Sequence, residues 1–330
     1  MASQLVDGFG RVAKKLRISI TDRCNMQCVY CMPQGNNKWI DSAEVLNDEE
    51  IIRLARIFAS LGIEKIRITG GEPMLRSGIE KMVSKLAKID GIRSVSITTN
   101  GLLFGDKINQ LKEAGLASVN ISLDTFRRER FEAMTGVDGV ARVVNCISLA
   151  RNAGLEVKVN TVVIRGWNDD EVVDFAKFAV DTGLAVRFIE FMPLDGSGIW
   201  APNLVFGKGE IIEKLRAALG EPIALGNPGS EPAQLYSIGG TGIVGFIPSI
   251  TEPFCGGCDR VRITSDGRFL TCLFENPGHD VKNLLRGGKS DGEIADYIAE
   301  GMRNKPEGIA AIIRLGRLRP KLNMMHEIGG

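Results

Sequence analysis

Three cysteines stand close together near the start of the chain, within the stretch TDRCNMQCVYCMP (21–33). Cys24, Cys28 and Cys31 follow the spacing C-x3-C-x2-C, and the stretch contains no fourth cysteine. A closed tetrahedral zinc site takes four protein ligands, whereas three thiolates on a four-iron cluster leave one iron without a protein ligand. The pattern therefore indicates an iron–sulfur site with one open position for a small molecule.

A second set of three cysteines lies in FCGGCDRVRITSDGRFLTC (254–272), where Cys255, Cys258 and Cys272 are spaced C-x2-C-x13-C. His279 follows Cys272 and could complete a zinc site of three thiolates and one imidazole, so this alternative stays open. Two three-cysteine sets are better explained by two clusters that each leave an iron open, the second of them binding substrate. Cys146, in the apolar helical pattern VVNCISLA, is expected to be an inert buried thiol.

Arg260 and Arg262 lie within the second stretch, on a predicted strand whose two-residue repeat sends both side chains to one face. Paired guanidinium groups bind polyphosphates through bidentate hydrogen bonds and suit an apolar core poorly. The pair predicts an anion site beside the second cysteine set, with a solvated strand face as the alternative.

The elements that must position these residues alternate along the chain. Amphipathic helices separate most of six β-branched runs, at 16–20, 65–69, 94–98, 118–123, 156–164 and 186–191. One such helix is predicted to start after an Asn47 cap and to end at Gly62. Repeated βα units predict a parallel sheet, most simply a partial (β/α)6-type TIM barrel, with a doubly wound sheet as the alternative.

The stretch GEPIALGNPGSEP (220–232) is rich in Gly and Pro and ends this alternation. We therefore expect a barrel domain over 1–222 and a smaller region over 223–330 that carries the second cysteine set. The string GTGIVG (240–245) matches a dinucleotide-binding pattern, but Pro248 follows where the helix would have to begin, so that function is rejected.

Composition narrows the functional classes. The 330 residues are 44% apolar and carry a net charge of +1, which gives no argument for nucleic-acid or membrane partners. The first 25 residues contain no apolar run of signal-peptide or membrane-span length, so a cytoplasmic location is expected. Clustered cysteines in such a chain favour metal or redox chemistry over disulfides.

Short polar motifs lie in or directly after the later predicted strands: TGGEP (69–73), TTNG (98–101), SLD (122–124), KVN (158–160) and EFM (190–192). With the first cysteine set directly after the first strand, the chain resembles the radical S-adenosylmethionine (SAM) superfamily. Nearly the whole chain is similar to one of its families, the molybdenum cofactor biosynthesis protein A family of GTP 3′,8-cyclases. The similarity includes both cysteine spacings, FIEFMP and the terminal GG.

This resemblance implies specific roles. Cys24, Cys28 and Cys31 would hold a catalytic [4Fe-4S] cluster, and the second set a [4Fe-4S] cluster that contacts guanine. The implied SAM contacts are Tyr30, Gly70, Gly71, Glu72, Ser122 and Met192. The implied GTP contacts are Arg17, Arg67, Thr98, Lys158, Arg260 and Arg262. Arg260, Arg262, Gly329 and Gly330 are further expected to take part in catalysis.

The implied reaction abstracts the C3′ hydrogen of GTP and joins the resulting C3′ radical to guanine C8. An added electron and proton then give 3′,8-cyclo-7,8-dihydro-GTP, and the enzyme is a lyase. The implied partners are an electron donor of the flavodoxin or ferredoxin type, a downstream cyclic pyranopterin monophosphate synthase, and a second copy in a homodimer.

Two features of the C-terminal segment leave its path open. Gly329 and Gly330 suit a tail that threads into a narrow cavity, although a frayed terminus is the alternative. Family members often have a histidine shortly after the pair that here is Lys305-Pro306, but this chain reads KPEGIAAII.

Two other hypotheses are weighed against the cyclase. One is a different radical SAM enzyme with an auxiliary cluster, acting on a peptide. The other is a zinc-stabilised binding protein that uses its arginines on a nucleic acid, against which the near-neutral charge and the lack of aromatic platforms in CDRVRITSDG weigh.

Overall fold

A computed structural model describes residues 4–32, 35, 39–194, 198–226, 230–275, 277–316 and 325–329. Its centre is a sheet of six neighbouring parallel strands that follow one another in chain order. Their bounds are β1 Lys15–Ser19, β2 Lys65–Thr69, β3 Ser94–Thr99, β4 Leu116–Ser122, β5 Glu156–Val163 and β6 Ala185–Glu190. A doubly wound sheet would reverse its strand order, so this order confirms the predicted partial barrel.

Strands from the C-terminal region extend this sheet at both edges. Beyond β6 the order continues with β9 Gly242–Ile247, which is parallel, and then antiparallel β8 Gln234–Ile238 and β7 Ile223–Gly226. Beyond β1 it continues with parallel β10 Arg260–Ile263 and antiparallel β11 Arg268–Leu270 and β12 His279–Asp280. GTGIVG therefore turns from β8 into β9 and opens no helix.

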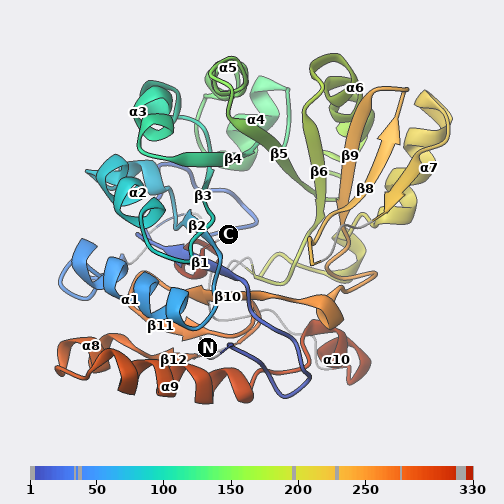
Figure 1. Ribbon diagram of the computed structural model, residues 1–330. Helices are drawn as coiled ribbons and strands as arrows, with labels where there is room; N and C mark the ends of the chain where they lie inside the picture. Colours follow the sequence, from blue (N-terminus) through green and yellow to red (C-terminus); the bar gives the residue numbers. More distant parts are fainter. Residues whose placement is uncertain are drawn as a thin grey trace.

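Helices cover the convex side of the curved sheet (Figure 1). On this side lie α1 Asp48–Ser60, α2 Ile79–Ala87, α3 Ile108–Glu113, α4 Arg128–Thr135, α5 Val140–Asn152, α6 Val172–Thr182 and α7 Lys208–Leu219. As predicted, α1 starts after Asn47, which forms a capping box with Glu50. The buried faces of these helices and of the strands form one continuous apolar core.

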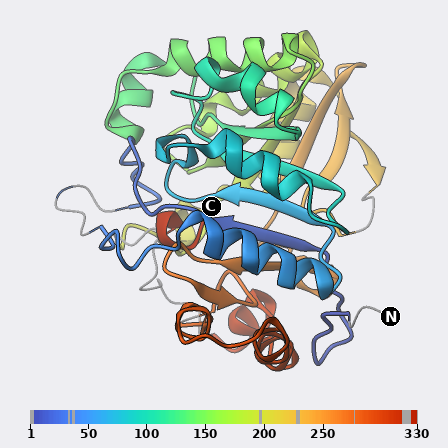
Figure 2. The same cartoon turned by 60° about the vertical axis from the view of Figure 1, so that its left-hand side comes forward.

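The chain ends with α8 Lys282–Arg286, α9 Asp291–Arg303, α10 Ile309–Arg314 and α11 Met325–Ile328. Short 3-10 helices lie at Pro73–Leu75, Gly105–Lys107, Asp169–Glu171, Pro202–Leu204 and Cys255–Gly257. The C-terminus lies inside the arc of strands, whereas the N-terminus lies outside it (Figures 1 and 2). Among the described residues, no helix is long and apolar enough to cross a membrane.

Candidate active site

The first cysteine set lies on the loop that follows β1. Backbone N–H groups of Cys31 and Met32 donate to Cys28 O at 2.9 and 3.1 Å and close a tight turn around the thiols. Cys24, Cys28 and Cys31 are partly buried free thiols that line a chamber of the concave face, here called the first chamber. This placement, at the carboxyl ends of the strands, is the one expected from sequence.

Burial raises the pKa of all three thiols, that of Cys24 to about 11. Thiols in this state are inert unless a metal replaces their protons, because only the thiolate is a ligand. Among the described residues, no three His, Cys, Asp or Glu side chains are arranged to hold a single metal ion. The donor set, three soft sulfurs around an open chamber, fits an iron–sulfur cluster.

The turn after β2 forms the opposite wall of the first chamber. Gly70 and Gly71 line it, and Gly70 has a φ of +156°, which favours glycine. Glu72 differs from the expectation of a SAM contact because its carboxylate points away from the chamber, toward β3. It accepts hydrogen bonds from Met74 N at 3.0 Å, Thr99 Oγ1 at 2.7 Å and Asn100 N at 2.7 Å, and burial raises its pKa to about 7.

The second cysteine set faces an adjoining chamber, here called the second chamber. Cys255, Cys258 and Cys272 line it together with Phe254 and Phe274. His279 does not line this chamber. Its Nε2 lies 3.3 Å from Glu275 Oε1, and its ring packs against those of Phe269 and Tyr297. The second chamber therefore presents three thiols as donors.

The two chambers share part of their walls. Tyr30, Thr98, Ser122, Asp124 and Met325 line both. Asp124 was missed in the sequence, although it belongs to the SLD motif at the end of β4. It accepts from Tyr30 Oη at 2.5 Å and Val162 N at 2.8 Å, and burial raises its pKa to about 6. Met192, an expected SAM contact, lines the second chamber.

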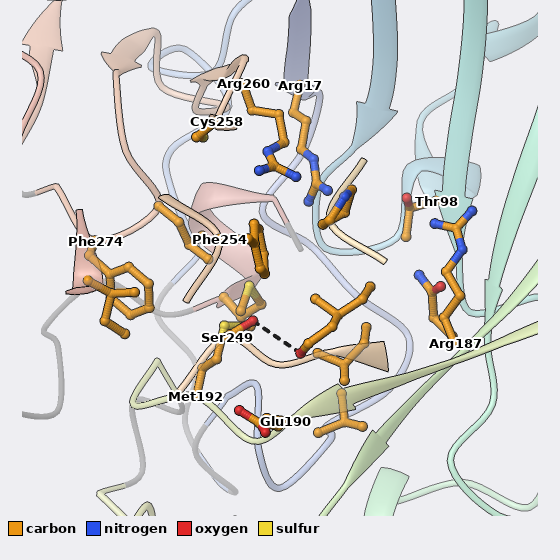
Figure 3. A pocket seen from close by; sticks show the side chains of 18 of the residues that line it. Arg17, Thr98, Arg187, Glu190, Met192, Ser249, Phe254, Cys258, Arg260 and Phe274 are labelled. Atoms are coloured by element: carbon orange, nitrogen blue, oxygen red, sulfur yellow. Dashed lines mark hydrogen bonds between the residues drawn. The ribbon is translucent and has the colours of Figure 1, made fainter. Parts of the chain in front are cut away.

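Arginines from several strands crowd the second chamber. Arg262, Arg17 and Arg67 lie in register on β10, β1 and β2, and Arg260 precedes Arg262 on the same strand face. Arg187 on β6 joins them, and sequence reasoning missed it because it is hidden in the apolar run VRFIEF. Figure 3 shows Arg17 and Arg260 pointing toward the same space, with Arg187 across the pocket.

These guanidinium groups repel one another in a dry environment. Burial and the neighbouring Arg262 and Arg67 hold the pKa of Arg17 well below its usual range. Burial also lowers the pKa of Arg262 and Arg187, each to about 10. A polyanion entering the chamber would relieve this repulsion, as the arginine pair in the sequence predicted.

Lys158 is the expected GTP contact that the structure places differently. It lies on β5 in register with Asn120, a lining residue, but does not itself line either chamber. Its Nζ pairs with Glu156. The expected contacts Arg17, Arg67, Thr98, Arg260 and Arg262 all line the second chamber.

The C-terminal segment enters the site, as the tail hypothesis predicted. Arg262 donates to the carbonyl oxygen of Gly329, and Met325 lines both chambers. Gly329 has a φ of +77°, and a Cβ there would lie 2.5 Å from Thr69 Cγ2, so the contact needs glycine. Gly330 lies outside the described residues.

Comparisons with known proteins identify the families that this chain matches. The family model "Radical SAM superfamily" matches residues 18–179, and "Molybdenum Cofactor Synthesis C" matches residues 184–311. The two matches meet between residues 179 and 184, whereas we expected the domain boundary at residue 222. The two-domain division stays a prediction.

Curated relatives match over nearly the full length. A protein of Thermodesulfovibrio yellowstonii named GTP 3′,8-cyclase is 42% identical over 98% of this chain and 99% of its own. A mitochondrial GTP 3′,8-cyclase of Arabidopsis thaliana is 39% identical over 100% of this chain and 84% of its own. The SuiB structure of Streptococcus suis with S-adenosylmethionine has a TM-score of 0.59 at 15% identity, covering 86% of this chain and 68% of that one. SuiB thus shows the fold alone.

Proposed function

Since the chain belongs to the GTP 3′,8-cyclase family of radical SAM enzymes, we propose that its two chambers convert GTP to 3′,8-cyclo-7,8-dihydro-GTP. This is an early step of molybdenum cofactor biosynthesis. The observation that carries the proposal is the pairing of two three-cysteine sets in adjoining chambers, with five arginines around one of them.

Each chamber has a distinct task in this proposal. Cys24, Cys28 and Cys31 hold the [4Fe-4S] cluster, which supplies the electron that cleaves SAM. Gly70 and Gly71 let the backbone approach the bound SAM closely, and Tyr30, held by Asp124, lies in the wall that both chambers share. Enclosure in the lumen excludes water and competing hydrogen donors while GTP reacts.

The second chamber orients GTP. We propose that Arg17, Arg67 and Arg187 bind its phosphates, because all three line the chamber, and burial and neighbouring arginines lower their pKa values. The second cysteine set would hold a second [4Fe-4S] cluster, which would supply an open iron to bind the guanine. The carbonyl of Gly329 fixes Arg262 beside it.

The remaining expectations belong to the same proposal. The enzyme would take electrons from a flavodoxin or ferredoxin type donor in the cytoplasm and pass its product to a cyclic pyranopterin monophosphate synthase. It would work as a homodimer. None of these partners requires a further site within the two chambers.

The decisive test is anaerobic incubation with GTP, SAM and dithionite, followed by mass spectrometry of the nucleotides. Because the hydrogen atom lost from C3′ is balanced by an added electron and proton, the proposal expects a product with the mass of GTP. Chromatography before the mass measurement should resolve it from GTP as a separate peak, formed together with 5′-deoxyadenosine. Unchanged GTP alongside 5′-deoxyadenosine would favour a different radical SAM substrate, such as a peptide. Bound zinc without iron would favour the nucleic-acid-binding alternative.

A further inference from the structure

A buried lysine contacts the second cysteine set. Lys305 lies between α9 and α10 and is only 3% exposed. Its Nζ lies 3.8 Å from Cys258 Sγ and donates to the carbonyl oxygen of Arg260 at 3.1 Å. Neither acceptor is a carboxylate, so the positive charge is directed at the sulfur site instead of being neutralised by an acid.

Hydrogen bonds from Arg11 hold the segment that carries Lys305 next to the loop of the second cysteine set. Arg11 donates to Pro306 O, Glu307 O and Cys255 O, each at 2.8 Å, and so joins this segment to the cysteine loop. Gly308 follows with a φ of +122°, and a Cβ there would lie 2.6 Å from Cys255 Sγ. The position of the ammonium group relative to the thiols is therefore fixed by backbone contacts.

A buried ammonium group costs free energy unless negative charge compensates for it. Three thiolates that hold a cluster would supply that charge.

Among the described residues, no lysine or arginine side chain forms a hydrogen bond to a sulfur atom of the first cysteine set. Cys24 Sγ accepts a hydrogen bond from the neutral side-chain amide of Asn100 at 3.9 Å and another from the backbone N–H of Met26 at 3.5 Å. The two sites thus differ in the charge of the group that donates to sulfur.

Hydrogen bonds to the sulfurs and nearby charge set the reduction potential of an iron–sulfur cluster. We propose that Lys305 is a positioning residue of the second metal site, which donates to Cys258 and favours the reduced form of the cluster held there. The inference rests on the second cluster of the proposed function, and extends it by naming a group that tunes this cluster.

The test isolates the second cluster in the full chain. A parent variant with Cys24, Cys28 and Cys31 all changed to Ala is reconstituted anaerobically, and its iron content and cluster potential are measured by a redox titration followed by electron paramagnetic resonance. Lys305→Met and Lys305→Arg are then compared in this parent. Lys289→Met is the matched control, since Lys289 pairs with Glu293 on the exposed surface of α9 and carries the same charge.

We expect Lys305→Met to keep its iron and to lower the reduced-to-oxidised ratio at the parent's midpoint about tenfold, which is about 59 mV for a one-electron couple. Lys305→Arg and Lys289→Met should stay close to the parent. A merely structural lysine would change the melting temperature without moving the potential.

An unchanged potential in iron-loaded Lys305→Met overturns the inference, while leaving the second cluster in place. An equal shift in Lys289→Met also overturns it, because net charge alone would then explain the effect. If Lys305→Met loses its iron, Lys305→Gln provides the same measurement, and loss of iron in Met, Gln and Arg variants alike refutes a role for the charge. A parent that binds no cluster overturns the proposed second site itself.

Discussion

The closest backbone approach beside the first cysteine set occurs at Gly71. A Cβ at this position would lie 2.2 Å from Arg23 O and 2.6 Å from Asp22 O. The two segments are also joined by hydrogen bonds from Gly71 N to Thr21 O and from Glu72 N to Arg23 O, both 2.8 Å. Because all these atoms belong to the backbone, no side-chain rotation can relieve the clash in Gly71→Ala.

The size of the effect follows from these distances. Real Cβ atoms essentially never lie closer than 3.0 Å to another heavy atom. To lengthen the distance between the new Cβ and Arg23 O from 2.2 Å to 3.0 Å, the two backbone segments must move apart by roughly 0.8 Å. Overpacking of this kind typically lowers the free energy of unfolding by about 1–3 kcal/mol. The displaced residue, Arg23, directly precedes the cluster ligand Cys24. A misplacement of about 1 Å can lower a rate by about 10²-fold. We therefore expect Gly71→Ala to lose about half its iron and at least about 10²-fold in 5′-deoxyadenosine formation.

Two other glycines serve as controls. Gly308→Ala should disturb the second set, because its Cβ would meet Cys255 Sγ, yet leave 5′-deoxyadenosine formation without GTP largely intact. Gly209→Ala should be harmless, since nothing lies within 4 Å of its Cβ, and should stabilise α7 by roughly 0.5–1 kcal/mol. The measurements are iron content, 5′-deoxyadenosine by chromatography, and melting temperature. Normal iron and normal 5′-deoxyadenosine in Gly71→Ala would refute the reasoning.

Three further predictions concern the second chamber, the tail and pH. Arg262→Ala should weaken GTP binding by at least about tenfold by calorimetry while SAM cleavage without GTP is retained, since hydrogen bonds to charged groups contribute about 1.5–3 kcal/mol; equal loss of both would indicate a folding defect. Deletion of Gly329 and Gly330 should leave GTP affinity largely intact but block cyclisation, and unaffected turnover would remove the tail from the mechanism. Burial raises the pKa of Glu72 to about 7, so the folded chain keeps a proton that the unfolded chain releases above its ordinary pKa of 4.5. The free energy of unfolding of the apoprotein should therefore fall, by roughly 1–3 kcal/mol between pH 5 and pH 8 from Glu72 alone, and urea titrations should show a smaller slope in Glu72→Gln, the remainder coming from Asp124, whose pKa burial raises to about 6.

Local patterns in the sequence predicted the first half of the fold closely. The six β-branched runs became β1 to β6, each bound shifting by no more than two residues, and the Asn47 capping box starts α1. These signals are local, because strand and helix periods and cap hydrogen bonds depend on neighbours in the chain. The pairing of β10 with β1 and of β9 with β6 could not be predicted in this way, because partner choice depends on contacts far apart in sequence.

In the site, too, local sequence patterns predicted some features, whereas features that depend on distant contacts were missed. The spacing of both cysteine sets and the two-residue period of Arg260 and Arg262 could be read from the local sequence, whereas the other GTP contacts came from the resemblance alone. Five of the six expected GTP contacts line the second chamber, and Lys158 does not. Lys158 shares the strand face of the lining residue Asn160, and only the pairing with Glu156 shows that its side chain is engaged elsewhere. Strand period gives the face of a side chain, not its partner.

The two cysteine sets occupy opposite electrostatic environments, and this difference matches the two tasks proposed for them. Buried carboxyl groups of Glu72 and Asp124 act on the first set and raise the pKa of its thiols further than burial alone. Cations act on the second, where Arg260 and Lys305 favour the thiolate of Cys258. Negative surroundings make an added electron harder to hold, so a cluster at the first site is the better reductant, as the cleavage of SAM requires. Positive surroundings hold a nucleotide polyanion, and a cluster there gives up its electrons less readily to SAM cleaved in the adjoining chamber.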